Sequence, residues 1–362
     1  MHTPKEIREN FLRTIEMRYP KWIPCRVVIS AATWNKYREK LEDILVKYPE
    51  IFPNFKKGSV KFGEFGLRRK GNVYIDRWGC VWKFAIDGIQ GQVVKHPLDD
   101  WRKLRNLRIP DPEEGLIYPP TTSGTPVLSW HLIEENVRRA HEEGRLAVIS
   151  FPHGFFFQRL YYLRGFINLM MDFVRRPPEL YELIELLTEY NLELIKRALK
   201  LKVDIITFGD DLGCQDRMPI SPKTFEEFIL PSYKRMFSLI RRAGVHVYFH
   251  TDGHVMEVVD YLISTGISVL NIQDRVNGIN NIKAKCKGKV CIDLDIDRQH
   301  LLPFGSRNQI REHIRKVIIE LGSKKGGLML TADIYPDVPL NNIDSVCQAM
   351  KEFMKLHLKL PY

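Results

Sequence analysis

Two apolar runs joined by one amphipathic helix decide the fold, namely VDIITFGDD at 203–211, SPKTFEEFILPSYKRMFSLIRRAG at 221–244 and VHVYFHTDG at 245–253. Runs that are apolar throughout and separated by helices predict parallel strands covered on both sides. The same rhythm recurs in LAVISF (146–151), ISVLNIQD (267–274), KVCIDLD (289–295) and GLMLTAD (327–333). No glycine-rich dinucleotide fingerprint follows any of these runs. Their number favours a (β/α)8 TIM barrel over a doubly wound sheet.

The first half of the chain has a different character, being irregular and rich in aromatic residues, proline and glycine. We expect residues 1–125 to form an N-terminal cap and the first strand, and residues 126–362 the main part of the barrel. The whole chain, 1–362, is then one domain. Within the cap, GLRRKGNVYIDRWGCVWKFA (66–85) predicts a β-hairpin that turns at KGN, residues 70–72.

Composition excludes several classes of protein. No apolar run approaches the roughly 20 residues that span a bilayer, and the N-terminus lacks the apolar core of a signal peptide, so we expect a cytoplasmic protein. The six cysteines include no CxxC pair, which favours reduced thiols. The net charge is +11, and the lysines and arginines are interspersed with aspartates and glutamates along the chain. No run of basic residues is interleaved with aromatic residues, so no nucleic-acid partner is expected. A basic surface fits an acidic partner protein or an anionic substrate.

Polar residues follow most of the predicted strands directly. They are His153, Asp210, Asp211, Gln215, His250, Asp252, Asp295, Asp333 and Tyr335. The carboxyl ends of barrel strands converge on one mouth, where active sites of this fold lie. A single Asp in such a place is equally a helix N-cap, but this repetition predicts a functional polar mouth.

Two chemistries fit these residues. A divalent metal could be held by His250, Asp252 and Asp333, although a set with few nitrogen ligands and no sulfur is not selective for zinc. Alternatively, the groups act as general acid and base, with burial and mutual repulsion raising the pKa of one carboxyl.

At these residues the chain resembles a known family. LRGFINLMMDF (163–173), the run from FGDDLGCQDRMPISPKTF to YKRMF (208–237), FHTDGHV (249–255), VCIDLDIDRQHLLPFG (290–305) and YPDVPLNNI (335–343) are similar to the uroporphyrinogen-decarboxylase superfamily. The resemblance covers roughly residues 126–355, with a weaker echo at YIDRWGCVW (74–82). It implies the barrel fold and one of three activities.

The chain departs from the sequence patterns of the enzymes that carry out two of these activities. The decarboxylases carry an Arg-Gln-Ala-Gly-Arg element that grips substrate carboxylates, whereas this chain reads WIPCRVVISAATWNKYREK at 22–40. Methyltransferases that pass a methyl group from a corrinoid protein to coenzyme M carry a His-x-Cys element and a later Cys. Here the first element is His250-Thr251-Asp252 and the last strand ends in Asp333. Carboxylates make a harder site, better suited to activating an oxygen than a thiol.

The phrases GDDLG-Q, H-x-D-G-H and DIDRQ-LLPFG look more like the O-demethylases of anaerobic metabolism. The resemblance implies a methyltransferase that moves a methyl group from a methoxylated, probably aromatic, small compound to the Co(I) corrinoid of a separate small protein. The three aromatic residues at 155–157 could stack on such a ring. The alternatives are thiol methylation, decarboxylation of the uroporphyrinogen type, and a non-catalytic tetrapyrrole- or corrinoid-binding module.

The O-demethylase hypothesis assigns a role to each of the polar strand-end residues. His250, Asp252, Asp211 and Asp333 are predicted to be catalytic, with a protonated carboxyl of Asp211 or Asp333, or zinc on His250, Asp252 and Asp333, stabilising the leaving oxygen. The expected substrate contacts are His153, Gln215, Tyr335, Asp210 and Asp295, the last of which could instead orient its neighbours or cap a helix. The family context is compatible with a monomer or a homodimer.

Overall fold

The computed structural model describes residues 2–120 and 127–360, and the chain divides into two compact units. The first unit joins residues 1–64 to residues 268–362, and the second consists of residues 65–267. The predicted boundary between residues 125 and 126 lies outside the described residues.

The first unit is built on four parallel strands in the order β1-β12-β11-β10. The strands are β1 (Cys25–Ile29), β10 (Val269–Gln273), β11 (Cys291–Asp295) and β12 (Leu328–Ile334). The helices are α1 (Pro4–Ile15), α2 (Ala31–Tyr37), α3 (Glu39–Leu45), α11 (Asp274–Asn277), α12 (Ile279–Cys286), α13 (Leu301–Phe304), α14 (Arg307–Leu321), α15 (Leu340–Phe353) and the 3₁₀ helix η2 (Leu356–Lys359).

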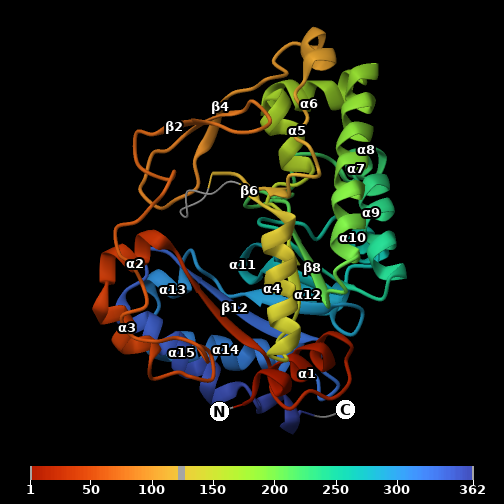
Figure 1. Ribbon diagram of the computed structural model, residues 1–362. Helices are drawn as coiled ribbons and strands as arrows, with labels where there is room; N and C mark the ends of the chain where they lie inside the picture. The colour runs from red at the N-terminus through yellow and green to blue at the C-terminus, as the bar shows by residue number, and fades with distance from the viewer. Residues whose placement is uncertain (1, 121–126, 361–362) are drawn as a thin grey trace. The chain divides into compact units, whose positions relative to one another are not determined.

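Helix α14 shows why the sequence forms these helices. The Ser306 hydroxyl accepts from the backbone N–H of Gln309, and the Gln309 side chain accepts from the backbone N–H of Ser306, a capping box that starts the helix. Its apolar residues recur on one face and are buried, as in Ile310, Ile314 and Val317. Helices α14 and α15 lie side by side (Figure 1), which buries that face.

The second unit contains three parallel strands in the order β9-β8-β7. Its strands are β2 (Val73–Ile75), β3 (Val81–Lys83), β4 (Gln92–Lys95), β5 (Leu116–Ile117), β6 (Val127–Leu128), β7 (Val148–Ser150), β8 (Ile205–Gly209) and β9 (His246–His250). Its helices are η1 (Trp101–Asn106), α4 (Trp130–Glu142), α5 (Phe157–Arg164), α6 (Phe166–Arg175), α7 (Pro178–Leu199), α8 (Pro222–Phe228), α9 (Leu230–Arg242) and α10 (Val259–Ser264).

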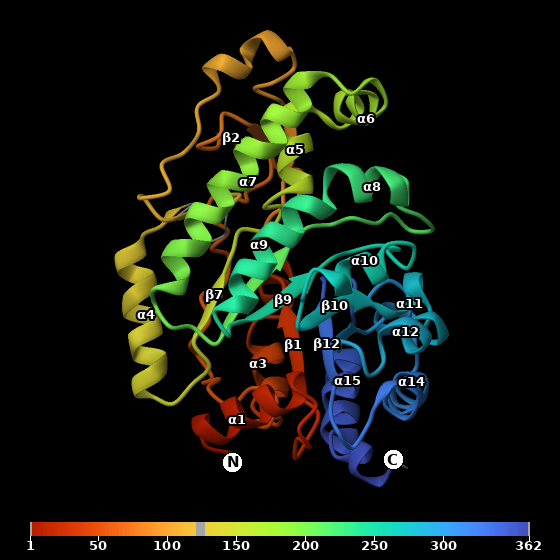
Figure 2. The same ribbon diagram turned by 90° about the vertical axis from the view of Figure 1, so that its right-hand side faces the viewer.

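An aromatic cluster fixes the ends of the second unit's parallel strands. The rings of Phe155 and Phe208 lie 4.9 Å apart, those of Phe208 and Phe237 5.1 Å, and those of Tyr233 and Phe249 5.5 Å. All five side chains are buried, and each contributes about 1.5–3 kcal/mol through burial. Helix α9 packs on β9 and on α7 (Figure 2), so the cluster ties helices and strands together.

The predicted hairpin forms, but its turn is elsewhere. Strands β2 and β3 are antiparallel, with β4 on the other side of β3. The prediction of a turn at residues 70–72 is wrong, because the chain reverses at residues 76–80. There a carboxylate oxygen of Asp76 accepts from the backbone N–H groups of Trp78 and Cys80, which closes the turn.

The described parts of both units together contain seven parallel strands that alternate with helices, which confirms the predicted (β/α)8-barrel class. Five of them fall within apolar runs identified in the sequence, and β12 extends one residue beyond the sixth run, to Ile334. Among the described helices, none is both long and apolar enough to cross a membrane.

Candidate functional site

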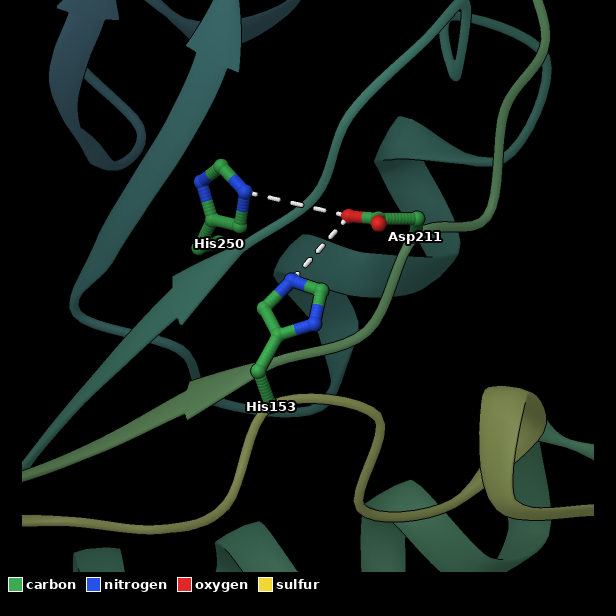
Figure 3. A group of neighbouring side chains, drawn as sticks. All are labelled: His153, Asp211 and His250. Carbon is green, nitrogen blue, oxygen red and sulfur yellow. Dashed lines mark ion pairs between the residues drawn. The ribbon is translucent and has the colours of Figure 1, made fainter. Parts of the chain in front are cut away.

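Two histidines and a carboxylate meet at the carboxyl ends of the second unit's parallel strands (Figure 3). His153 follows β7, Asp211 follows β8, and His250 is the last residue of β9. The Nε2 atom of His153 lies 3.2 Å from Oδ1 of Asp211, and the Nε2 atom of His250 lies 3.7 Å from the same oxygen. The two imidazole rings are 5.5 Å apart. Neighbouring strands thus deliver three polar side chains to one point.

A glycine makes room for one of these rings. Gly209 ends β8 and pairs in register with His250. A Cβ added at Gly209 would lie only 2.5 Å from Cδ2 of His153, closer than carbon atoms pack. Gly209 therefore sets how near the His153 ring can approach Asp211.

The loops after β8 and β9 are held together through their backbones. Gly253 has a φ of +82° and approaches the backbone of Gly213 so closely that neither has space for a side chain. The N–H of Gly213 donates to the carbonyl of Asp252 at 3.1 Å. The N–H of Asp252 donates to Oδ1 of Asp211 at 3.1 Å, and Oδ1 of Asp252 lies 3.5 Å from Nε2 of His250. Gly213 and Gly253 thus bring together the loops that carry both carboxylates.

Sequence reasoning missed one residue of the site, Gln158 on α5. Its Nε2 donates to Oδ2 of Asp211 at 3.1 Å, and its Oε1 accepts from the Asp211 backbone N–H at 3.1 Å. The side chain is buried and also donates to the hydroxyl of Tyr161. This paired contact fixes the carboxylate's orientation. The only sequence signal was a polar residue directly after three phenylalanines.

The electrostatics separate the roles of His153 and Asp211. Burial by itself raises the pKa of Asp211, but the hydrogen bond and charge attraction of His153, with His250 and the Asp252 N–H, hold it well below its ordinary value. Burial lowers the pKa of His153, and Asp211 outweighs this and raises it above 6.5. A protonated Asp211 is therefore disfavoured at neutral pH, which argues against it as the proton donor.

Asp210 has the opposite character from its neighbour. It is fully buried, and burial raises its pKa to about 6 against the effect of three hydrogen bonds. Those bonds come from the backbone N–H groups of Phe157 and Gln158 and from the hydroxyl of Tyr233. Asp210 thus caps the start of α5, which carries Gln158. Its expected contact with substrate stays a prediction.

The His153–Asp211–His250 group is also suited to holding a metal ion. One ligand atom from each residue lies within 4.8 Å of the other two. Two imidazole nitrogens and a carboxylate oxygen are ligand types that zinc accepts, and three protein ligands leave a fourth position open, as in catalytic zinc sites. The same set also suits ferrous iron. This group shares only His250 with the predicted metal set, and His153 and Asp211 stand where the sequence prediction had Asp252 and Asp333.

The contacts of the remaining predicted residues are described by unit. Gln215 is exposed in the second unit. Asp333 belongs to the first unit, where its Oδ2 lies 2.8 Å from Nη1 of Arg298, and Asp295 lies 3.4 Å from the same atom. The Tyr335 ring centroid is 5.7 Å from the Arg298 guanidinium carbon. Arg298, which sequence reasoning did not single out, thus brings together three predicted residues. Their roles stay predictions.

The fold and the strand-end cluster define an α/β-barrel protein with a polar site at the carboxyl ends of its strands. A model of the family described as Uroporphyrinogen decarboxylase (URO-D) matches residues 76–353, more than half of the chain. The chain therefore belongs to the uroporphyrinogen decarboxylase family, and membership in a family of enzymes supports an enzymatic role.

Known relatives are distant. The uroporphyrinogen decarboxylase of Carboxydothermus hydrogenoformans is 20% identical over 290 residues, covering 78% of this chain and 76% of the relative. That of Geotalea daltonii is 23% identical over 269 residues, covering 71% and 72%. The solved structure of a methyltransferase from Methanosarcina mazei, 15% identical, covers 98% of this chain and 99% of its own with a TM-score of 0.62. That likeness shows the shared fold.

Proposed function

We propose that this protein is a methyltransferase that moves a methyl group from a methoxylated small compound to the Co(I) corrinoid of a separate protein. The observation that carries the proposal is the thiolate-free group of His153, Asp211 and His250. Nitrogen and oxygen ligands suit a site that activates an ether oxygen rather than a thiol. The methyltransferase of the same fold is compatible with this chemistry.

The reaction places a clear demand on the site. The methyl–oxygen bond breaks, the methyl carbon passes to the corrinoid, and the oxygen keeps the bonding electron pair and gains a proton. A zinc ion on His153, Asp211 and His250 would supply Lewis-acid stabilisation to that oxygen. The chain's own contribution is to hold the ligands in place, and Gln158 and the Asp252 N–H do so for the Asp211 carboxylate.

Two alternatives from the sequence remain testable beside this proposal. Decarboxylation is favoured by the names of the relatives, but Arg26 of the segment 22–40 is engaged within the protein, where its guanidinium lies 3.3 Å from Asp293 and 3.2 Å from Thr331. Transfer to a thiol of the coenzyme M type requires a softer site than His153, Asp211 and His250 provide.

The first experiment is elemental analysis of purified wild type and His250→Ala. We expect about one equivalent of zinc in the wild type, lost in the variant, and methyl transfer from methoxylated aromatic donors to a Co(I) corrinoid protein, followed by the change in the corrinoid spectrum. His141→Ala, at an exposed position of α4, is the matched control. Carbon dioxide release from a porphyrinogen without a corrinoid partner would overturn the proposal in favour of decarboxylation, and methylation of coenzyme M would favour the thiol reaction.

A further inference from the structure

A pocket of the first unit shares no residue with the His153–Asp211–His250 group. Its volume is about 620 Å³, within the range of about 300–1,000 Å³ that small-molecule sites span. Residues of α1, of the amino-terminal halves of β1 and β12, of β11, of the loop after α3 and of the end of α15 line it. The pocket therefore lies toward the amino-terminal ends of the first unit's strands.

Apolar side chains form much of the wall. Ile51, Met329 and Leu330 are among the lining residues, and all three are buried side chains of the core. Trp22 adds an indole on which the ring of His2 stacks, with 3.9 Å between the ring centroids and 11° between the planes. This part of the wall thus accommodates a flat ring. Such a lining favours an apolar ligand with aromatic rings.

The charges of the lining are balanced within the protein. Each lining carboxylate forms an ion pair, namely Glu50 with Lys351 at 2.8 Å, Glu352 with Arg311 at 2.5 Å, and Asp293 with Arg26 at 3.3 Å. Lys355 forms no ion pair with a described residue, but it is exposed, so water and salt screen its charge. A charged ligand would lose its hydration here without meeting a buried opposite charge, and an uncharged ligand is therefore favoured.

Two hydrogen-bond donors are within reach of a ligand. The Arg26 side chain is 53% exposed, whereas that of its partner Asp293 is 5% exposed, so a ligand meets the guanidinium rather than the carboxylate. Trp22 is 7% exposed, and its indole N–H donates to no described residue while it keeps some contact with solvent. A largely buried N–H of this kind favours a ligand atom that accepts a hydrogen bond.

We propose that this pocket binds a flat, uncharged aromatic molecule that carries a carbonyl oxygen. The rings would lie along the apolar wall, and the carbonyl oxygen would accept from the N–H groups of Arg26 and Trp22. A carbonyl oxygen has two lone pairs, so it can accept from both. Barrel active sites lie at the carboxyl ends of the strands, so a molecule bound at the other end would stabilise the first unit rather than react.

The test measures binding of Nile red, an uncharged aromatic dye with a carbonyl group that fluoresces in apolar surroundings. Two probes then compete with the dye. They are fluorenone and fluorene, which share one flat ring skeleton and differ in the carbonyl oxygen of fluorenone. We expect fluorenone to displace the dye at about a 10-fold lower concentration than fluorene. A carboxylate derivative of fluorenone should displace it less well than fluorenone.

Substitutions place the binding in this pocket. Met354→Trp fills the space and should abolish saturable dye binding, whereas Met171→Trp, at an exposed methionine of the second unit, should not. Trp22→Phe removes the indole N–H and keeps an aromatic ring. Arg26→Met combined with Asp293→Asn removes the ion pair without leaving a buried charge unpaired. Both changes should reduce the preference for fluorenone, and circular dichroism checks that each variant is folded.

Several results would overturn the proposal. They are no saturable binding of Nile red by the wild type, undiminished binding in Met354→Trp, equal displacement by fluorenone and fluorene, and stronger displacement by the carboxylate derivative. A preference for fluorenone that survives both Trp22→Phe and the Arg26→Met, Asp293→Asn double substitution would also overturn it.

Discussion

Gly209→Ala offers a sharp test of the proposed metal site, because the substitution acts on a ligand without replacing it. The new Cβ would lie 2.5 Å from Cδ2 of His153, and ordinary carbon contacts begin near 3.4 Å. The ring must therefore retreat by about 1 Å. Its Nε2, now 3.2 Å from Oδ1 of Asp211, would then move out of hydrogen-bond range.

The expected effect is a loss of metal affinity of about 10- to 100-fold, the range found when the groups that orient a ligand are disturbed. Overpacking a protein core typically lowers the free energy of unfolding by about 1–3 kcal/mol. We expect a smaller loss for Gly209→Ala, because the His153 side chain is 41% exposed and can shift. Zinc affinity is measured by competition with a chromogenic chelator, which requires no knowledge of the substrate.

Two controls make the result interpretable. Gly244→Ala introduces a side chain at a φ of +77° with no atom within 4 Å, so it strains the backbone without touching the site. His153→Ala, alone and combined with Gly209→Ala, closes a double-mutant cycle. If Gly209 acts through His153, the second substitution costs no further affinity. Equal affinity in Gly209→Ala and wild type would refute the reasoning that the His153 ring is held against Asp211 for metal binding.

Three further predictions concern the surroundings of the site and the stability of the fold. Gln158→Leu removes both hydrogen bonds to Asp211, so zinc affinity should fall about 10- to 100-fold in the chelator assay, and an unchanged affinity would contradict the orienting role. Tyr233→Phe removes the hydroxyl that donates to buried Asp210, which should lower the free energy of unfolding in urea by about 1–3 kcal/mol. Burial lowers the pKa of His357 below 6.5, so the unfolded chain takes up a proton there more readily than the folded chain. Stability should therefore decline as the pH falls below about 6.5, and His357→Gln should reduce that decline between pH 7.5 and 5.5.

The order of strands and the place of the polar residues were readable from the sequence. Each of the six apolar runs contains a strand, because a strand covered on both faces must be apolar throughout. The sequence also showed that His153, Asp211 and His250 follow or end strands. Parallel strands present their carboxyl ends at one edge of the sheet, so these residues could be assigned to that edge. The hairpin turn was misplaced because KGN and Asp76 both carry turn signals, and only the side-chain hydrogen bonds of Asp76 select between them.

Which polar residues share a site was decided by the tertiary structure. Asp210 and Asp211 are neighbours in the chain, yet their pKa values move in opposite directions, because successive residues point to different surroundings. Gln158 meets Asp211 across 53 residues of sequence, and Asp333 meets Arg298 across 35. Short apolar runs along a chain predict strands, since they reflect local geometry and burial on both faces of a sheet. Distances between side chains on different strands depend on packing between distant segments, and no local pattern records them.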